Sequence, residues 1–275
     1  MTRFINNTKT AMLLGLMFGL ILLAGHLLGG TQGLVIAFLF GGLGNIFAYF
    51  FSDKIALTAM RGQQVDARTA PDLIEMVSRL SRNANLPMPK VYVCPQQAPN
   101  AFATGRNPKN AAVAVTQGAL SLLTYDELEG VMAHELAHVK NRDTLTSTVA
   151  ATIAGVISAT WWIHFFGGGR DSNPLVALAF VLLAPLAAGV IQMAISRSRE
   201  YVADADGAEI AGTPHGLISA LQKLEATAKR VPMHQEVPTQ NHMFIVQPLS
   251  GQGLAGLFST HPRTADRVAK LRELA

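Results

Sequence analysis

Residues 124–141 have the sequence TYDELEGVMAHELAHVKN, and this stretch predicts the helix around which the rest of the chain is organised. Thr124 and Glu127 have the spacing of a capping box, so we expect the helix to begin at Thr124. His134 and His138 are then one turn apart on one face, where both imidazoles can bind a single metal ion. Glu135 projects toward the same cavity, where a carboxylate can take a proton from a metal-bound water.

A third metal ligand is expected outside this helix. A catalytic zinc ion normally has three protein ligands and one open position. Glu200, in the stretch SREYVAD (198–204), is the best candidate. Asp204 is one helical turn further on, where it can accept a hydrogen bond from a ligand histidine. The alternative for Glu200 is a surface charge paired with Arg197 or Arg199.

Four stretches of the chain contain no charged residue: 11–28, 33–51, 144–168 and 174–196. Each is close to the roughly 20 residues that cross the hydrocarbon layer of a membrane. Charged residues make up only 15% of the 275 residues, whereas an average soluble chain has about 25%. These features predict two transmembrane hairpins. For the last two stretches, buried helices of a soluble core are the alternative.

The domain organisation follows from these stretches. We expect an N-terminal transmembrane hairpin in residues 1–52, and a catalytic domain in 53–275 that a second hairpin interrupts. If the second hairpin is antiparallel, its two ends meet and Glu200 lies beside His134 and His138. Lys and Arg flank the outer ends of the spans, which places both termini and the segments 52–143 and 197–275 in the cytoplasm.

The polar remainder predicts a small α+β domain. Apolar spacing indicates helices over 70–84, 213–229 and 262–274. Strands are expected at Lys90–Cys94 and Ala111–Val115, with a turn-rich loop between them. The segment 231–255 is rich in Pro, Gln and Gly and predicts a long loop.

The motifs together resemble the HtpX family of bacterial membrane metalloproteases. The resemblance rests on HELAH (134–138), VKNRDTL (139–145), a hydrophobic pair, SRSREYVAD (196–204) and STHP (259–262), and it covers nearly the whole chain. The CAAX prenyl proteases are more distantly similar. The resemblance implies a mostly α, multi-pass membrane protein with an α+β, zincin-like protease domain that has a small β-sheet.

The resemblance also implies a function and a set of site residues. One Zn²⁺ per chain would be bound by His134, His138 and Glu200, with Glu135 as the catalytic acid and base. The expected activity is stress-related quality control at the bacterial inner membrane, where misfolded or damaged membrane proteins are cleaved at the cytoplasmic face.

Two further groups of residues are candidates for the same site. His261 and Arg267 are possible donors to the oxyanion of a tetrahedral intermediate. Their alternative role is capping and ion pairing of the last helix. An exposed strand edge at Asn100, Ala101, Phe102 and Ala103 would bind an extended substrate through its backbone, and a plain loop is the alternative.

Composition excludes several other classes. Cys94 is the single cysteine, so no intrachain disulfide can form. The net charge of +4 comes without a basic patch, which argues against a nucleic-acid partner. We expect a membrane and unfolded or membrane-protein substrates as partners, and no organic cofactor. The oligomeric state stays open.

Two rival functions stay open at this point. An intramembrane protease would place the histidine motif inside an apolar span, yet charged residues flank the motif here on both sides. A membrane adaptor with a structural zinc would need four closed ligand positions, usually Cys or His, and the chain has one cysteine.

Overall fold

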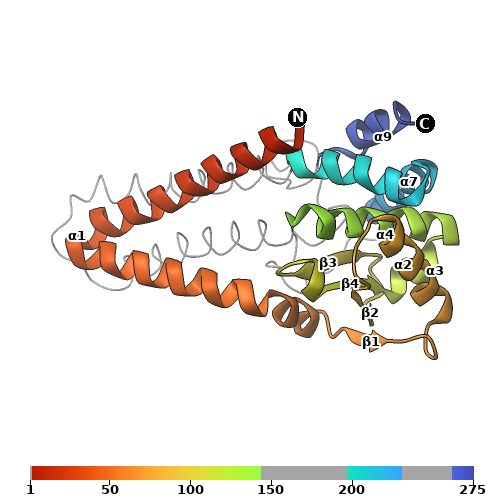
Figure 1. Ribbon diagram of the computed structural model, residues 1–275, viewed down its shortest axis with the longest axis horizontal. Coiled ribbons are helices and arrows are strands. Elements are labelled where there is room, and N and C mark those ends of the chain that lie inside the picture. Colours follow the sequence, from red (N-terminus) through yellow and green to blue (C-terminus); the bar gives the residue numbers. More distant parts are fainter. Residues whose placement is uncertain (1, 144–196, 231–261) are drawn as a thin grey trace. The chain divides into compact units, whose positions relative to one another are not determined.

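The computed structural model describes residues 2–143, 197–230 and 262–275 (Figure 1). The chain forms two compact units. The described part of the first unit is residues 2–50, and that of the second is 51–143, 197–230 and 262–275. The predicted stretches 144–168 and 174–196 and the predicted loop 231–255 lie outside the described residues.

The first unit contains most of α1 (Thr2–Ala59), which is two helical arms joined at a kink. The kink lies at Gly29 and Gly30, and Gly30 has a φ of 58°, which glycine adopts at little cost. Phe18 and Phe38, from the two arms, meet edge to face with ring centroids 6.3 Å apart. The arms match the predicted stretches 11–28 and 33–51 in position. Among the described residues, no helix is long and apolar enough to cross a membrane.

The second unit contains a mixed four-stranded sheet in the order β1-β2-β4-β3. Its strands are β1 (Gln63–Val65), β2 (Lys90–Cys94), β3 (Ala101–Gly105) and β4 (Ala111–Thr116). β2 and β4 are parallel, and β1 and β3 run antiparallel at the two edges. The predicted strands are confirmed as β2 and β4. The prediction of a plain loop between them was wrong at Ala101–Gly105, where β3 forms at the edge of the sheet; the alternative of a strand edge in this stretch is confirmed.

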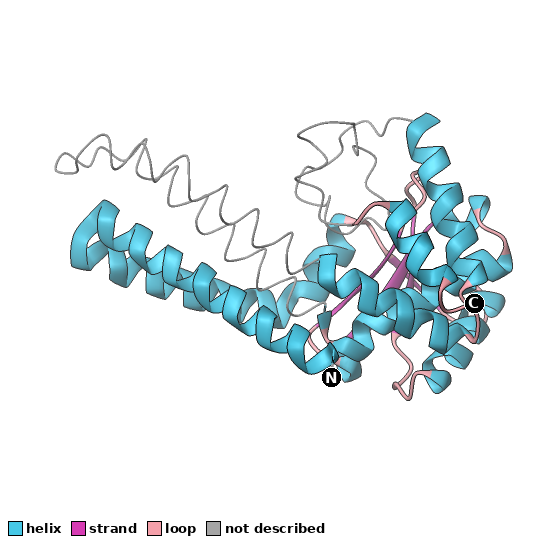
Figure 2. Cartoon of the chain, turned by 90° about the horizontal axis from the view of Figure 1, so that it is seen from above, coloured by secondary structure: helices cyan, strands magenta, loops and turns pink. Residues whose placement is uncertain are grey.

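Both faces of the sheet are covered, as the alternation of β4 shows. Val113 and Val115 belong to the large core cluster on one face, while Ala112 and Ala114 belong to a smaller cluster with Leu57 on the other. This alternation is the two-residue period of a strand. Figure 2 shows the strands surrounded by helices.

Helices of the second unit pack into the large core, and some of them carry the candidate site. These are α2 (Pro71–Asn83), α3 (Gln117–Leu122), α4 (Tyr125–Asn141), a helix over 197–211, α7 (His215–Arg230) and α9 (Thr264–Arg272). In Figure 1, α4 lies between the sheet and α7, and it contacts β3, β4 and α7. The predicted helices 70–84, 213–229 and 262–274 are confirmed as α2, α7 and α9.

Candidate metal centre

The helix α4 holds the histidine motif in the interior of the second unit. The predicted capping box is present: the Thr124 hydroxyl accepts from the Glu127 backbone N–H, and the Glu127 carboxylate accepts from the Thr124 N–H. His134 is 1% exposed and Glu135 is also buried. The His138 side chain is 15% exposed, so solvent reaches the pair from its side.

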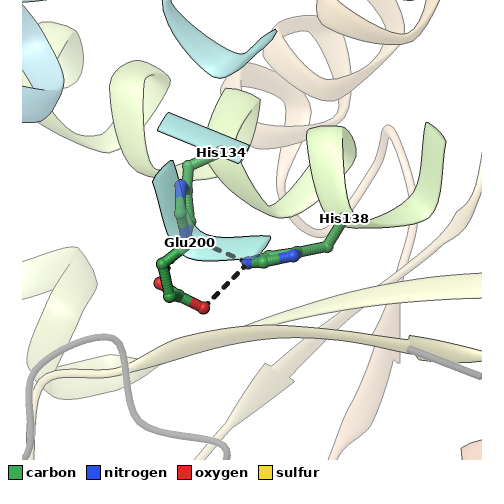
Figure 3. Close-up of side chains that lie close together, drawn as sticks. All are labelled: His134, His138 and Glu200. Carbon is green, nitrogen blue, oxygen red and sulfur yellow. Dashed lines mark hydrogen bonds and ion pairs between the residues drawn. The ribbon is translucent and has the colours of Figure 1, made fainter. Parts of the chain in front are cut away.

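The helix over 197–211 brings Glu200 to these histidines, as Figure 3 shows. The Nε2 atoms of His134 and His138 are 3.2 Å apart. The Glu200 carboxylate oxygens lie 3.6 Å from His134 Nε2 and 3.5 Å from His138 Nε2. The three residues predicted as ligands are therefore together, with all three donor groups within 4.8 Å of one another.

Gly207 permits this approach of the two helices. A Cβ atom at Gly207 would lie 2.9 Å from the His134 Cα and 3.0 Å from its N atom. Real Cβ atoms do not come so close to backbone, so a larger residue would push the helix over 197–211 away from α4. Glu200 and Asp204 lie on that same helix. The absence of a side chain at Gly207 therefore lets the helix that carries Glu200 lie close enough for Glu200 to contact the histidines.

The donor set fits a divalent metal ion. Two imidazoles and one carboxylate form a ligand set of catalytic zinc sites. With zinc–ligand bonds of about 2.0–2.1 Å, the edges of a tetrahedron are roughly 3.3–3.4 Å long. The separations of 3.2, 3.5 and 3.6 Å between the donor atoms are close to those edges.

Each histidine has a carboxylate at its Nδ1 atom. Asp204 Oδ1 lies 3.1 Å from His134 Nδ1, and Asp143 Oδ2 lies 3.1 Å from His138 Nδ1. For His138, the hydrogen bond between Nδ1 and Asp143 fixes the tautomer in which the Nε2 lone pair can bind metal. For His134, Asp204 is close to Nδ1 without completing a hydrogen bond there, and Arg267 Nη2 lies 3.4 Å from His134 Nε2. The sequence predicted Asp204 in this position, and it missed Asp143.

Arg267 from α9 lies against the same carboxylates. Its side chain is 1% exposed. Its Nη2 donates to Asp204 Oδ1 at 2.6 Å, and its Nε donates to Asp204 Oδ2 at 2.9 Å. Its Nη1 also lies 3.5 Å from Glu200 Oε2. Its closest contact is therefore the bidentate pair with Asp204. His261, the other predicted oxyanion donor, lies outside the described residues.

The charges of the cluster support a cation at its centre. Around the two imidazoles lie four carboxylates (Glu135, Asp143, Glu200 and Asp204) and two guanidinium groups (Arg199 and Arg267). With neutral imidazoles, this set carries an excess of two negative charges, which one divalent cation would balance. Buried charges require such compensation.

The buried charges of the cluster also shift the pKa values of the two histidines. Burial alone lowers the pKa of His134, but the carboxylates of Asp204 and Glu200 outweigh burial and raise it. Burial and the neighbouring His134 lower the pKa of His138. The anionic surroundings therefore favour positive charge at His134, while the second imidazole is favoured in its neutral, metal-binding form.

Glu135 faces the edge strand β3. Burial raises the pKa of Glu135, while a hydrogen bond from the Ala103 backbone lowers it. Of the other residues predicted to bind substrate, Phe102 packs its side chain into the smaller core cluster, and Asn100 and Ala101 are buried. Only the backbone of this stretch is therefore placed beside the catalytic candidate.

Comparison with known proteins agrees with this fold and shows the family of the chain. Residues 67–275 match the peptidase family M48. A protease HtpX homolog of Persephonella marina is 51% identical, over 97% of this chain and 96% of its own length. One from Salinibacter ruber is 53% identical, over 98% of each chain. The crystal structure of S. mikatae Ste24p shares the fold, with a TM-score of 0.58 at 19% identity, over 98% of this chain and 66% of that one.

The chain belongs to peptidase family M48, whose fold here combines a small mixed sheet with helices. Within that family it groups with the protease HtpX homologs, as the motifs predicted.

Proposed function

We propose that this chain is a membrane-anchored, zinc-dependent endopeptidase. Its ligands are His134, His138 and Glu200, and its general acid and base is Glu135. The observation that carries the proposal is the convergence of two imidazoles and one carboxylate at 3.2–3.6 Å, beside a second buried carboxylate. Membership of a peptidase family supports hydrolysis of peptide bonds as the reaction.

The residues around this centre divide the chemistry among them. Zinc held there by His134, His138 and Glu200 would lower the pKa of a bound water and polarise the scissile carbonyl. Glu135 accepts a proton from the attacking water and delivers it to the leaving amine. The burial that raises the pKa of Glu135 helps it hold that proton between the two steps.

Asp204 and Arg267 complete the proposed site from the side of His134. Asp204 orients the imidazole through Nδ1, and Arg267 in turn holds Asp204 with two hydrogen bonds. This engagement supports a positioning role for Arg267. The oxyanion role that the sequence suggested for Arg267 and His261 stays a prediction.

An extended polypeptide is the proposed substrate. β3 is an edge strand, paired on one side with β4. The Ala103 backbone that reaches Glu135 lies in this strand. A substrate added alongside residues 101–103 would present its backbone to Glu135, and edge-strand pairing needs no particular side-chain sequence. Such recognition suits misfolded or damaged membrane proteins, which share exposed backbone rather than one motif.

The membrane anchor is proposed from the apolar arms of α1 and the two stretches that follow α4. Residues 10–52 contain no Asp, Glu, Lys or Arg. Large apolar side chains of both arms are exposed, among them Met12 (70%) and Phe38 (55%). A bacterial inner membrane would cover such surface, with the catalytic unit and both termini on the cytoplasmic side. Extraction of membranes at alkaline pH tests this: release of the full-length chain into the supernatant would contradict the anchor.

Substitution of Glu135 tests the catalytic assignment. Purified in detergent, the chain should contain one zinc per molecule and hydrolyse casein. Glu135→Gln should keep the zinc and lose roughly 10²–10⁴-fold in rate, which is the usual contribution of a general acid and base. Undiminished hydrolysis would remove Glu135 from the mechanism. Zinc without hydrolysis in the unmodified chain would favour a membrane adaptor.

Mapping of cleavage sites separates this proposal from an intramembrane protease. The substrate is a membrane protein with one span and flanking cytoplasmic segments. We expect cuts in the cytoplasmic segments, since charged residues flank the motif on both sides. Cuts confined to the middle of the span would contradict the proposal.

A further inference from the structure

Asp143 connects the two elements that bear the proposed metal ligands. It lies just beyond the C-terminal end of α4, after Arg142, whose backbone is left-handed with a φ of 59°. The helix α4 ends at that residue. The Asp143 Oδ2 atom thereby comes to 3.1 Å from Nδ1 of His138, which is five residues earlier.

The other carboxylate oxygen of Asp143 is engaged by Arg199. Its Oδ1 accepts a hydrogen bond from Arg199 Nη1 in a buried ion pair. Arg199 immediately precedes Glu200 on the helix over 197–211. The Asp143 carboxylate therefore contacts the proposed ligand His138 on one side. On the other side it contacts Arg199, which is next to the proposed ligand Glu200.

We propose that Asp143 is a positioning residue for His138, and that Arg199 holds Asp143 in that position. This inference rests on the proposed zinc site. When Nδ1–H of His138 donates to Asp143, the Nε2 lone pair points toward His134 and Glu200 and the imidazole becomes a stronger ligand. The Arg199 guanidinium compensates the buried charge of Asp143 and keeps its carboxylate from turning away.

The pair also fixes two distant parts of the chain against each other. Asp143 and Arg199 are separated by 56 positions. A second contact at this end of α4 is the hydrogen bond from Asn141 Nδ2 to Asp206 Oδ2, at 2.6 Å. Closure of a segment this long has an entropic cost that a buried ion pair helps to offset. The spacing between His138 and Glu200 therefore depends on Asp143 and Arg199.

A purely structural ion pair is the competing interpretation, and α4 supplies a matched control for it. At the other end of the helix, Glu127 is buried and accepts from Lys223 Nζ at 2.6 Å and Ser219 Oγ at 2.7 Å. This pair ties α4 to α7 and contacts neither histidine. Asp143→Asn and Glu127→Gln both remove a buried carboxylate charge from a contact of α4, but only the first removes a partner of a proposed ligand.

The experiment compares zinc release from the full-length chain in detergent. Zinc-loaded protein is mixed with excess chelator, and the rate of transfer is measured together with thermal unfolding of the metal-free form. We expect Asp143→Asn to weaken zinc binding roughly 10–100-fold, which is typical of lost outer partners of a metal ligand. Arg199→Gln should have a smaller effect of the same sign. Glu127→Gln should lower the unfolding temperature and leave zinc release unchanged.

Cobalt substitution gives a readout that a structural role would not change. The visible absorption of bound Co²⁺ reports the ligand field, so Asp143→Asn should alter the spectrum and Glu127→Gln should not. Zinc release from Asp143→Asn as slow as from Glu127→Gln, with an unaltered cobalt spectrum, would overturn the inference. Should Asp143→Asn fail to fold, Arg199→Gln decides by the same two measurements. Failure of the unmodified chain to bind zinc would instead overturn the proposed function.

Discussion

The two ends of α4 both carry buried charges, and they differ in what those charges face. At the N-terminal end the Glu127 carboxylate accepts hydrogen bonds from Lys223, Ser219 and the Thr124 backbone. The Glu127 carboxylate oxygens therefore already accept hydrogen bonds from groups of the protein. At the C-terminal end, the Nε2 atoms of His134 and His138 face each other and the Glu200 carboxylate. At that end, the imidazole nitrogens and carboxylate oxygens therefore converge on one point.

This difference shows that buried charge alone does not identify a functional site. Burial by itself would raise the pKa of Glu127, yet the hydrogen bonds lower it to about 2. The N-terminal cluster is thus satisfied without any ion. The C-terminal cluster has two negative charges in excess when its four carboxylates are ionised and its imidazoles are neutral, and one divalent cation would balance them. Variants at the two ends of the same helix should therefore separate stability from metal binding.

The largest expected effect is at the ligand Glu200. Glu200→Gln should lower zinc affinity by more than the roughly 10–100-fold expected for an outer partner, because it replaces a charged ligand. Hydrolysis of casein should fall with zinc content. Zinc per chain, measured by mass spectrometry of the purified protein, checks this, and Glu127→Gln is the control that should keep its zinc. Full occupancy with normal activity would transfer the ligand role to Asp204 or Asp206.

A smaller effect is expected where helices approach α4 most closely. A Cβ atom would lie 2.9 Å from His134 Cα at Gly207, and 2.3 Å from Leu217 N at Gly130. Either Gly→Ala substitution should cost about 1–3 kcal/mol of stability by overpacking. Only Gly207→Ala should also speed zinc release, because it displaces the helix that carries Glu200. Equal zinc release from the two variants would show that this helix spacing does not control the site.

The smallest effect is expected from protonation of the Glu127 side chain at low pH. Its pKa in the folded chain is lowered from 4.5 to about 2, so its contribution is full above pH 4.5 and is lost as the pH falls toward 2. Because Lys223 is partly exposed, we expect a loss of about 1–2 kcal/mol over this range. Urea unfolding of the metal-free chain at several pH values measures it. In Glu127→Gln this pH dependence should shrink, and an unchanged profile would assign it to other carboxylates.

The sequence predicted the parts of this unit that have strong local patterns. The capping box at Thr124 and Glu127 located the start of α4, and apolar spacing located α2, α7 and α9. The position of Glu200 near the histidines followed from assuming that the ends of a hairpin meet.

The features that the sequence indicated only as an alternative, or missed, lack such patterns. β3 has the sequence AFATG, in which alanine and glycine have little preference for strands, and its pairing with β4 is what stabilises it. Asp143 reaches His138 only because Arg142 adopts a left-handed backbone, which is uncommon for residues other than glycine. A carboxylate five residues after a ligand histidine, just beyond the end of its helix, is the pattern to look for in other sequences.

Arg267, bound to Asp204 from the last helix, has a consequence for biosynthesis. A ribosome makes His134 and His138 first, Glu200 62 positions after His138, and Arg267 a further 67 positions after Glu200. At about 5–20 residues per second, roughly 3–12 s pass between the second histidine and Glu200. The charged cluster is complete only after Arg267 has been made. The order of translation therefore keeps the nascent polypeptide free of an assembled centre while residues 134–267 are synthesised.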